Sequence, residues 1–245
     1  MSLKFERLGD LDCLVQRNPQ SQASVVLLHG YGADFTDLAG LVPMISLPED
    51  VNWVFPNAPL PLPEQFGSSG RAWFPIDVMA LERAMQTGSR RYFADQKSAG
   101  LDKAVDAVIA CLKASELPFE SMALGGFSQG AMIASHAALG HQLPIPLLLQ
   151  LSGTLIGHGL IKPSPASQNM SVFQSHGVQD PVLPYSAAEE LKVHLETLCQ
   201  SVDFYGFTGG HEIPRPLLAK LASKIQDNVL RNEPKNSHKQ PGMNP

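Results

Sequence analysis

The stretch Gly126-Phe127-Ser128-Gln129-Gly130 decides how the rest of this 245-residue sequence is interpreted. It follows a short apolar run at residues 121–124 and opens a segment of small residues that continues through 131–138. Glycines on both sides of a serine permit a sharp, strained turn that lifts the serine hydroxyl clear of a strand end. A strand, a sharp turn and a helix in this order are typical of a nucleophile elbow. Alone, the pentapeptide also fits a glycine-rich turn with a capping serine, so the remaining chain must decide.

Short apolar runs bounded by Gly, Pro or Asn alternate along the chain with segments of helical periodicity. The expected strands are 24–28, 52–55, 121–124, 147–151, 171–174 and 202–207, and the expected helices are 101–117, 186–198 and 217–230. Most of the strands are apolar on both faces, as buried parallel strands are. The alternation therefore predicts an α/β fold with a mostly parallel central sheet and helices on both faces.

The composition is that of a folded, soluble chain, with 44% hydrophobic and 17% charged residues. The length suits one domain, expected over 1–231, and the polar segment 232–245 is expected to be a disordered tail. A net charge of -5 offers no basic field to nucleic acid. No apolar run is long enough to span a membrane, and no signal peptide is predicted. Three widely spaced cysteines indicate a reducing, cytoplasmic setting.

A serine hydroxyl needs a histidine base that a carboxylate holds in one tautomer. In folds with such an elbow, the three residues follow one another along the chain as serine, acid and histidine. Asp180 lies in a turn after the predicted strand 171–174, and His211 lies in a glycine-rich loop after the strand 202–207. Because ligands bind at the carboxyl ends of such strands, we predict Ser128 as nucleophile, Asp180 as acid and His211 as base.

Other residues compete for these roles. His176 is an alternative base, although its place beside Asp180 favours a structural role. Asp203 or Glu212 replaces Asp180 as the acid only if the loop geometry differs from the expected one. His29 could suggest a metal, but a lone histidine at a strand end more often hydrogen-bonds its own loop. The sequence predicts neither a metal nor a cofactor.

An oxyanion hole requires two backbone N–H groups that point toward the developing negative charge. One comes from the residue after the nucleophile, which is Gln129, and the other from a loop after an earlier strand. That loop is His29-Gly30-Tyr31-Gly32, where the glycines let the backbone turn its amides inward. We expect Tyr31 to supply the second N–H group.

Six stretches form one ordered pattern over nearly the whole chain, at 27–32, 55–59, 73–74, 126–130, 176–185 and 210–213. Jointly they resemble the phospholipase/carboxylesterase family of α/β-hydrolases, which includes acyl-protein thioesterases and small bacterial carboxylesterases. The resemblance implies a single-domain α/β-hydrolase fold and assigns the triad to Ser128, Asp180 and His211. It also implies an oxyanion hole formed by the Tyr31 and Gln129 amides.

Two features depart from the family pattern. An aspartate commonly follows the Trp-Phe pair, whereas Pro75 follows it here. The segment 76–98 is longer than in compact members and mixes apolar with charged residues, so it is either a lid over the site or an ordinary surface helix. Trp73 and Phe74 are expected to line an acyl pocket, and the alternative is that both belong to the core.

The sequence thus predicts a serine hydrolase that cleaves carboxylic esters or thioesters through an acyl-enzyme. Carboxylesterase activity is preferred, with acyl-protein thioesterase or lysophospholipase activity as alternatives. The expected partner is a small ester or acyl thioester, an acylated protein or a lysolipid, without integral membrane association. A non-catalytic binding protein on the same scaffold is the alternative from another class. Monomer and homodimer both stay open.

Overall fold

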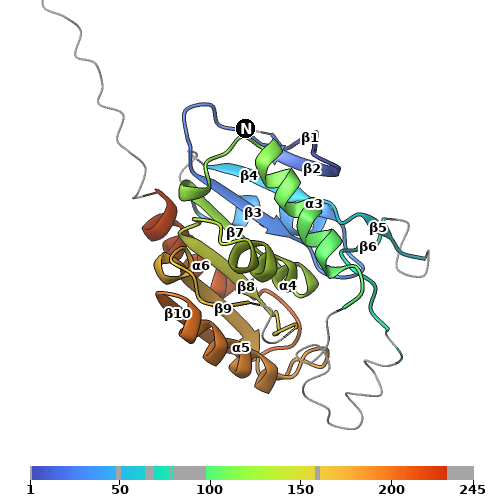
Figure 1. The fold of residues 1–245 in the computed structure, drawn as a ribbon, viewed down its shortest axis with the longest axis vertical. Helices are drawn as coiled ribbons and strands as arrows, with labels where there is room; N and C mark the ends of the chain where they lie inside the picture. Colours follow the sequence, from blue (N-terminus) through green and yellow to red (C-terminus); the bar gives the residue numbers. More distant parts are fainter. Residues whose placement is uncertain are drawn as a thin grey trace, which may run out of the picture.

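The computed structural model describes residues 2–47, 51–63, 69–77, 79, 98–157 and 161–230. Within them, the main strands are β1 (Lys4–Leu8), β2 (Leu11–Gln16), β3 (Ser24–Leu28), β4 (Asn52–Pro56), β7 (Met122–Phe127), β8 (Leu147–Leu151), β9 (Ser171–Gly177) and β10 (Ser201–Phe207). They form one sheet in the order β1-β2-β4-β3-β7-β8-β9-β10 (Figure 1). The pairs β1–β2 and β2–β4 are antiparallel, and every later pair is parallel. A small ribbon pairs β5 (Leu60–Pro61) with β6 (Arg71–Ala72).

Helices cover both faces of this sheet. The helices are α1 (Phe35–Ala39), α3 (Leu101–Ala114), α4 (Gln129–Ser135), α5 (Tyr185–Leu198) and α6 (Arg215–Ile225). Shorter helical turns are η1 (Val42–Met44), η3 (Phe119–Ser121), η4 (His136–Gly140), η5 (Ser167–Asn169) and η6 (Gln226–Leu230). The helices α3 and α4 lie in front of the sheet in Figure 1. Apolar side chains of α3, α4 and α5 belong to one core, whereas those of α1 and α6 belong to a second core.

The apolar pattern of the sequence explains this layering. All of β3 is buried, with Val26 and Leu28 in one core and Val25 and Leu27 in the other. Side chains alternate between the two faces of a strand, so a strand covered on both sides must be apolar throughout. Each such side chain contributes about 1.5–3 kcal/mol when it is removed from water. The buried parallel strands therefore hold the sheet between its two helical layers.

The predicted fold class is confirmed, since each expected strand and helix is present, most of them with shifts at their ends. The strand predicted at 121–124 continues as β7 up to Phe127, directly before Ser128. The antiparallel hairpin of β1 and β2 was not predicted. The edge strand β1 carries exposed charged residues, and Arg7 pairs with Asp12 at 2.6 Å, so β1 lacks the apolar pattern of the inner strands.

Two predictions fall outside the described residues. These are the lid predicted at 76–98, of which the structure describes only residues 76, 77, 79 and 98, and the tail predicted at 232–245. The division into a domain over 1–231 and a tail therefore stays a prediction. No helix within the described ranges is long and apolar enough to cross a membrane.

Candidate active site

Ser128 occupies the sharp turn between β7 and α4, with a φ of 54° and a ψ of -117°. A positive φ on a residue other than glycine costs about 1–3 kcal/mol and persists only where the surroundings impose it. A Cβ at Gly126 would lie 2.5 Å from the carbonyl carbon of Gly130, and a Cβ at Gly130 would overlap the carbonyl oxygen of Leu28. Only glycine fits at either position, so the two glycines permit the close approach that the pentapeptide predicted for this turn.

Asp180 and His211 meet directly, although they follow different strands. His211 Nδ1 lies 2.6 Å from Oδ2 of Asp180, whose side chain is fully buried. The other oxygen, Oδ1, accepts hydrogen bonds of 2.8 Å from the amides of Val182 and Leu183. Because Oδ2 accepts, Nδ1 of His211 carries a proton, and in the neutral ring Nε2 is then the acceptor. This is the tautomer that a general base requires.

The electrostatics of Asp180 keep it ionised. Burial raises the pKa of this carboxyl group, but hydrogen bonds from His176, His211 and the Leu183 amide outweigh burial and hold the pKa well below its usual range. Hydrogen bonds to the charged form have this effect because they stabilise the carboxylate over the acid. The aspartate therefore stays negative at neutral and mildly acidic pH.

The ring of His211 lies beside the elbow. Its centroid is 4.7 Å from that of Phe127, the residue before Ser128, and its side chain is 16% exposed. A Cβ at Gly177 would overlap the carbonyl oxygen of Gly210, so the end of β9 and the His211 loop are packed backbone to backbone. The structure thus joins Asp180 to His211 and sets His211 next to the elbow. The catalytic roles of the three residues stay a prediction.

The two predicted oxyanion donors lie on segments that meet at Ser128. A Cβ at Gly30 would lie 3.4 Å from the Cβ of Ser128, so the loop after β3 runs along the elbow. Arg71 holds this loop, since its N–H donates to Ala33 and its carbonyl accepts from Gly32, both at 2.9 Å. Tyr31 lies between Gly30 and Gly32. On the other segment, Gln129 is the first residue of α4, where backbone N–H groups have no acceptor within the helix. Their role as oxyanion donors stays a prediction.

Trp73 and Phe74 are almost completely buried, at 1% and 0% exposure. The Trp73 N–H donates to Oε1 of Gln129, and Nε2 of Gln129 donates to the Phe74 carbonyl, both at 2.8 Å. The indole N–H of Trp73 donates to the carbonyl of His29 at 2.8 Å. This segment therefore ties the elbow to the loop after β3. Such burial fits the core alternative, and lining an acyl pocket stays a prediction.

His29 uses both ring nitrogens within the fold. Its Nε2 accepts from the Ala58 amide at 3.0 Å, so Nδ1 carries the proton and donates to the Gly30 carbonyl at 2.8 Å. Burial lowers the pKa of His29, which favours this neutral ring. His29 therefore hydrogen-bonds its own loop through Gly30 and a second loop through Ala58, as expected of a lone histidine at a strand end. The described residues contain no group of three or more His, Cys, Asp or Glu side chains placed to hold a metal ion.

The competing residues take other positions. Asp203 lies on β10, and its Oδ2 forms an ion pair with Nζ of Lys224 on α6 at 2.7 Å. The carboxylate of Glu212 lies beside Gly209, where a Cβ would come within 2.5 Å of its Oε1. His176 lies behind Asp180, with its Nε2 at 3.2 Å from Oδ2 and its side chain fully buried. The turn at 177–180 brings His176 and Asp180 into contact, and their proximity in the sequence is the signal that favoured a structural role for His176.

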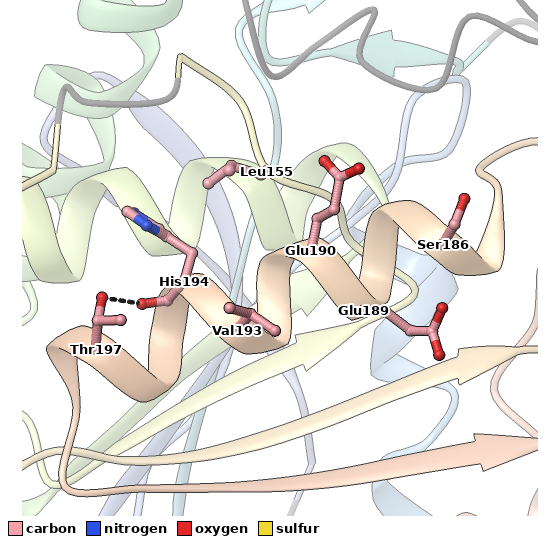
Figure 2. A pocket seen from close by; sticks show the side chains of 7 residues that line it. All are labelled: Leu155, Ser186, Glu189, Glu190, Val193, His194 and Thr197. Carbon is pink, nitrogen blue, oxygen red and sulfur yellow. Dashed lines mark hydrogen bonds between the residues drawn. The ribbon is translucent and has the colours of Figure 1, made fainter.

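A separate pocket of about 690 Å³ lies along α5. Figure 2 shows its lining, which consists of Leu155 and α5 side chains: Ser186, Glu189, Glu190, Val193, His194 and Thr197. Thr197 Oγ1 donates to the carbonyl of His194 at 2.7 Å. Size alone does not mark a reactive site, and this pocket contains none of the predicted triad, oxyanion or acyl-pocket residues.

Replacing Trp73 by phenylalanine is expected to lower the free energy of unfolding by about 1–3 kcal/mol. Phenylalanine keeps a buried ring but removes the indole N–H, which leaves the His29 carbonyl without this donor. Urea unfolding measures the change. Trp53→Phe is the matched control, because Trp53 is also buried and loses the same ring volume. A loss in Trp73→Phe no larger than in the control would contradict the contribution of the indole hydrogen bond.

Three features define an α/β-hydrolase. They are the mostly parallel sheet, the glycine-flanked serine turn and the Asp–His pair at the same edge of the sheet. The model of the phospholipase/carboxylesterase family matches residues 12–229. The chain therefore belongs to the phospholipase/carboxylesterase family and is a hydrolase, which confirms the resemblance carried by its motifs.

Known proteins of this kind cover nearly the whole chain. Acyl-protein thioesterase 1 of Mycosarcoma maydis is 29% identical over 235 residues, which are 86% of this chain and 91% of the relative. The structure of Zea mays acyl-protein thioesterase 2 has a TM-score of 0.68 at 23% identity and covers 89% of this chain and 98% of its own. A carboxylesterase from Mesorhizobium loti has a TM-score of 0.69 at 19% identity, covering 91% and 98%. The two structures confirm the fold.

Proposed function

We propose that this protein is a serine hydrolase that cleaves carboxylic esters or acyl thioesters with Ser128, His211 and Asp180 as its triad. The observation that carries the proposal is the 2.6 Å contact between His211 and the buried Asp180 beside the serine elbow. A buried, ionised carboxylate on Nδ1 both orients a histidine and stabilises its protonated form during reaction.

The reaction proceeds through an acyl-enzyme. His211 Nε2 takes the hydroxyl proton of Ser128 as Oγ bonds to the substrate carbonyl carbon, and the carbonyl electrons move to its oxygen. The amides of Tyr31 and Gln129 donate to that oxyanion. His211 then passes the proton to the leaving alcohol or thiol as its bond to carbon breaks. Water attacks the acyl-enzyme in the same way, so the acid is released and Ser128 regains its proton.

The substrate class follows from the family and from the relatives. The family description covers ester hydrolysis, and the curated relative from Mycosarcoma maydis is named as an acyl-protein thioesterase. We prefer a small carboxylic ester as substrate, with an acyl-protein thioester or a lysolipid as alternatives. We also propose a cytoplasmic location without nucleic acid as a partner, as the net charge of -5 and the scattered cysteines favour.

A substrate panel tests this function. Hydrolysis of p-nitrophenyl esters of increasing acyl length is compared with hydrolysis of an acyl thioester, on the wild type and on Ser128→Ala. A fall in kcat/KM beyond short acyl chains supports the carboxylesterase, whereas faster cleavage of a long-chain thioester supports the alternative. A wild type that cleaves no member of the panel and is not labelled at Ser128 by a fluorophosphonate contradicts the proposal and favours the non-catalytic binding protein.

The turnover is expected to fall toward acidic pH, because a general base that has taken up a proton cannot accept the serine proton. Asp180 adds no second fall in this range. Burial raises the pKa of that carboxyl group, but its hydrogen bonds lower the pKa by more, so Asp180 stays charged throughout this pH range. The kcat/KM profile between about pH 5 and pH 8 checks this expectation. A flat profile with chemistry rate-limiting would remove His211 from the role of base.

A further inference from the structure

His176 is a buried imidazole in the site that the reaction steps above do not use. It lies near the end of β9, and its side chain has 0% exposure. Its Nε2 is 2.9 Å from the carbonyl oxygen of Leu183 and 3.2 Å from Oδ2 of Asp180. Both of these oxygens accept hydrogen bonds, so Nε2 carries a proton and faces the two of them.

The opposite ring nitrogen supports the same tautomer. Nδ1 of His176 is buried and makes no hydrogen bond within the part of the chain that the structure describes. An unpaired buried N–H on a charged ring would cost more than an unpaired ring nitrogen on a neutral one. The neutral ring with its proton on Nε2 therefore fits this position. In this tautomer, Nε2 of His176 is a donor that faces the Leu183 carbonyl and Asp180.

The two donors converge on one carboxylate oxygen. Oδ2 of Asp180 faces His211 Nδ1 at 2.6 Å and His176 Nε2 at 3.2 Å, while Oδ1 accepts from the Val182 and Leu183 amides. Leu183 contributes twice, since its N–H binds Oδ1 and its carbonyl accepts from His176. The carboxylate cannot rotate without breaking contacts at both oxygens. Such a connected buried network fixes the geometry of each member.

We propose that His176 is a positioning residue that holds Oδ2 of Asp180 in place for His211. This inference rests on the proposed function, in which His211 is the base. The contact also has an electrostatic effect, because an oxygen that accepts one N–H attracts a second N–H less strongly. His176 thereby limits how strongly Asp180 favours the protonated form of His211. The base then stays available to lower pH than with Asp180 alone.

Among the residues that the structure describes, four titratable groups lie near the ring of His176 or in the adjoining loop. Besides Asp180 and His211, Tyr185 at the start of α5 has its ring centroid 6.2 Å from that of His176. The carboxylate of Glu212 lies beside Gly209 in the loop after β10. A substitution at His176 leaves these groups in the sequence. A change in the pH profile of such a variant therefore reports the loss of the N–H that faces Asp180.

The test compares pH profiles of kcat/KM for the wild type, His176→Phe and His176→Gln. Release of p-nitrophenol from a short-chain ester is followed at a wavelength where its absorbance does not depend on pH. Phenylalanine fills the space of the ring but donates nothing, whereas glutamine carries an amide N–H at a similar reach. His176→Phe is expected to lower kcat about tenfold. It is also expected to move the acid limb of the profile, where kcat/KM falls with decreasing pH, upward by roughly half a pH unit to one pH unit. His176→Gln returns the limb toward the wild-type position.

An acid limb of His176→Phe that coincides with the wild-type limb overturns the proposal, because a purely structural histidine changes the melting temperature and not the limb. If His176→Phe does not fold, His176→Asn takes its place, since its amide ends short of Asp180 and the same two outcomes apply. Ser128→Ala in the same assay separates the proposals. Full activity in Ser128→Ala means that the proposed function itself fails. Lost activity there, with an unmoved limb at position 176, means that only the positioning role fails.

Discussion

Ser128→Ala is expected to lower kcat by about 10⁵- to 10⁶-fold and to leave the fold intact. The variant lacks the oxygen that forms the acyl-enzyme, and neither His211 nor the oxyanion amides can replace it. Alanine occupies the elbow as serine does, because the turn depends on Gly126 and Gly130 and on the strand beside them. The free energy of unfolding should therefore change by no more than about 0.5 kcal/mol.

Kinetics, urea unfolding and labelling with a fluorophosphonate check this result together. Ser186→Ala is the matched control, since Ser186 lies in the pocket along α5 and not at the elbow. The control is expected to keep wild-type kcat and labelling. Undiminished hydrolysis by Ser128→Ala would show that another group carries the reaction. A large loss of stability in Ser128→Ala would show that the serine hydroxyl also supports the fold.

The elbow was predictable because its requirements are local. The close approach of Gly126 to Gly130 arises within five residues, so the sequence itself states that side chains are excluded there. Asp180 and His211 were predictable for another reason. The carboxyl ends of parallel strands share one edge of a sheet, so polar residues after two such strands meet even when they are far apart in the chain.

Contacts between side chains of distant segments left no comparable signal. The bond from the Trp73 indole to the His29 carbonyl depends on how two loops pack, and no pattern in the sequence indicates it. Cys13 and Cys111 appeared scattered, yet their sulfur atoms lie 3.6 Å apart in the core between β2 and α3. Periodicity shows which face of an element is buried, but it does not show which partner that face meets.

Asp180→Asn is expected to lower kcat about 10⁴-fold while its loop keeps its shape. The amides of Val182 and Leu183 both need an acceptor, so the amide oxygen of the new side chain takes the place of Oδ1. Its NH₂ group then takes the place of Oδ2 and donates to Nδ1 of His211. The histidine must carry its proton on Nε2, the atom that has to accept the serine proton. The NH₂ group also opposes the Nε2–H of His176, which weakens the site further.

The matched control for this variant is Asp203→Asn on β10. Its partner is Lys224, the Asp203 side chain is 42% exposed, and exposed ion pairs contribute about 0–1 kcal/mol. This control should keep wild-type kcat. Asp180→Asn with activity within tenfold of the wild type would place the acid elsewhere, at Glu212 first. Asp180→Asn retains Ser128, and its His211 is present but in a tautomer that cannot accept the serine proton. This variant should therefore still react slowly with the fluorophosphonate, whereas Ser128→Ala should not react at all. That difference separates a missing nucleophile from a histidine in the wrong tautomer.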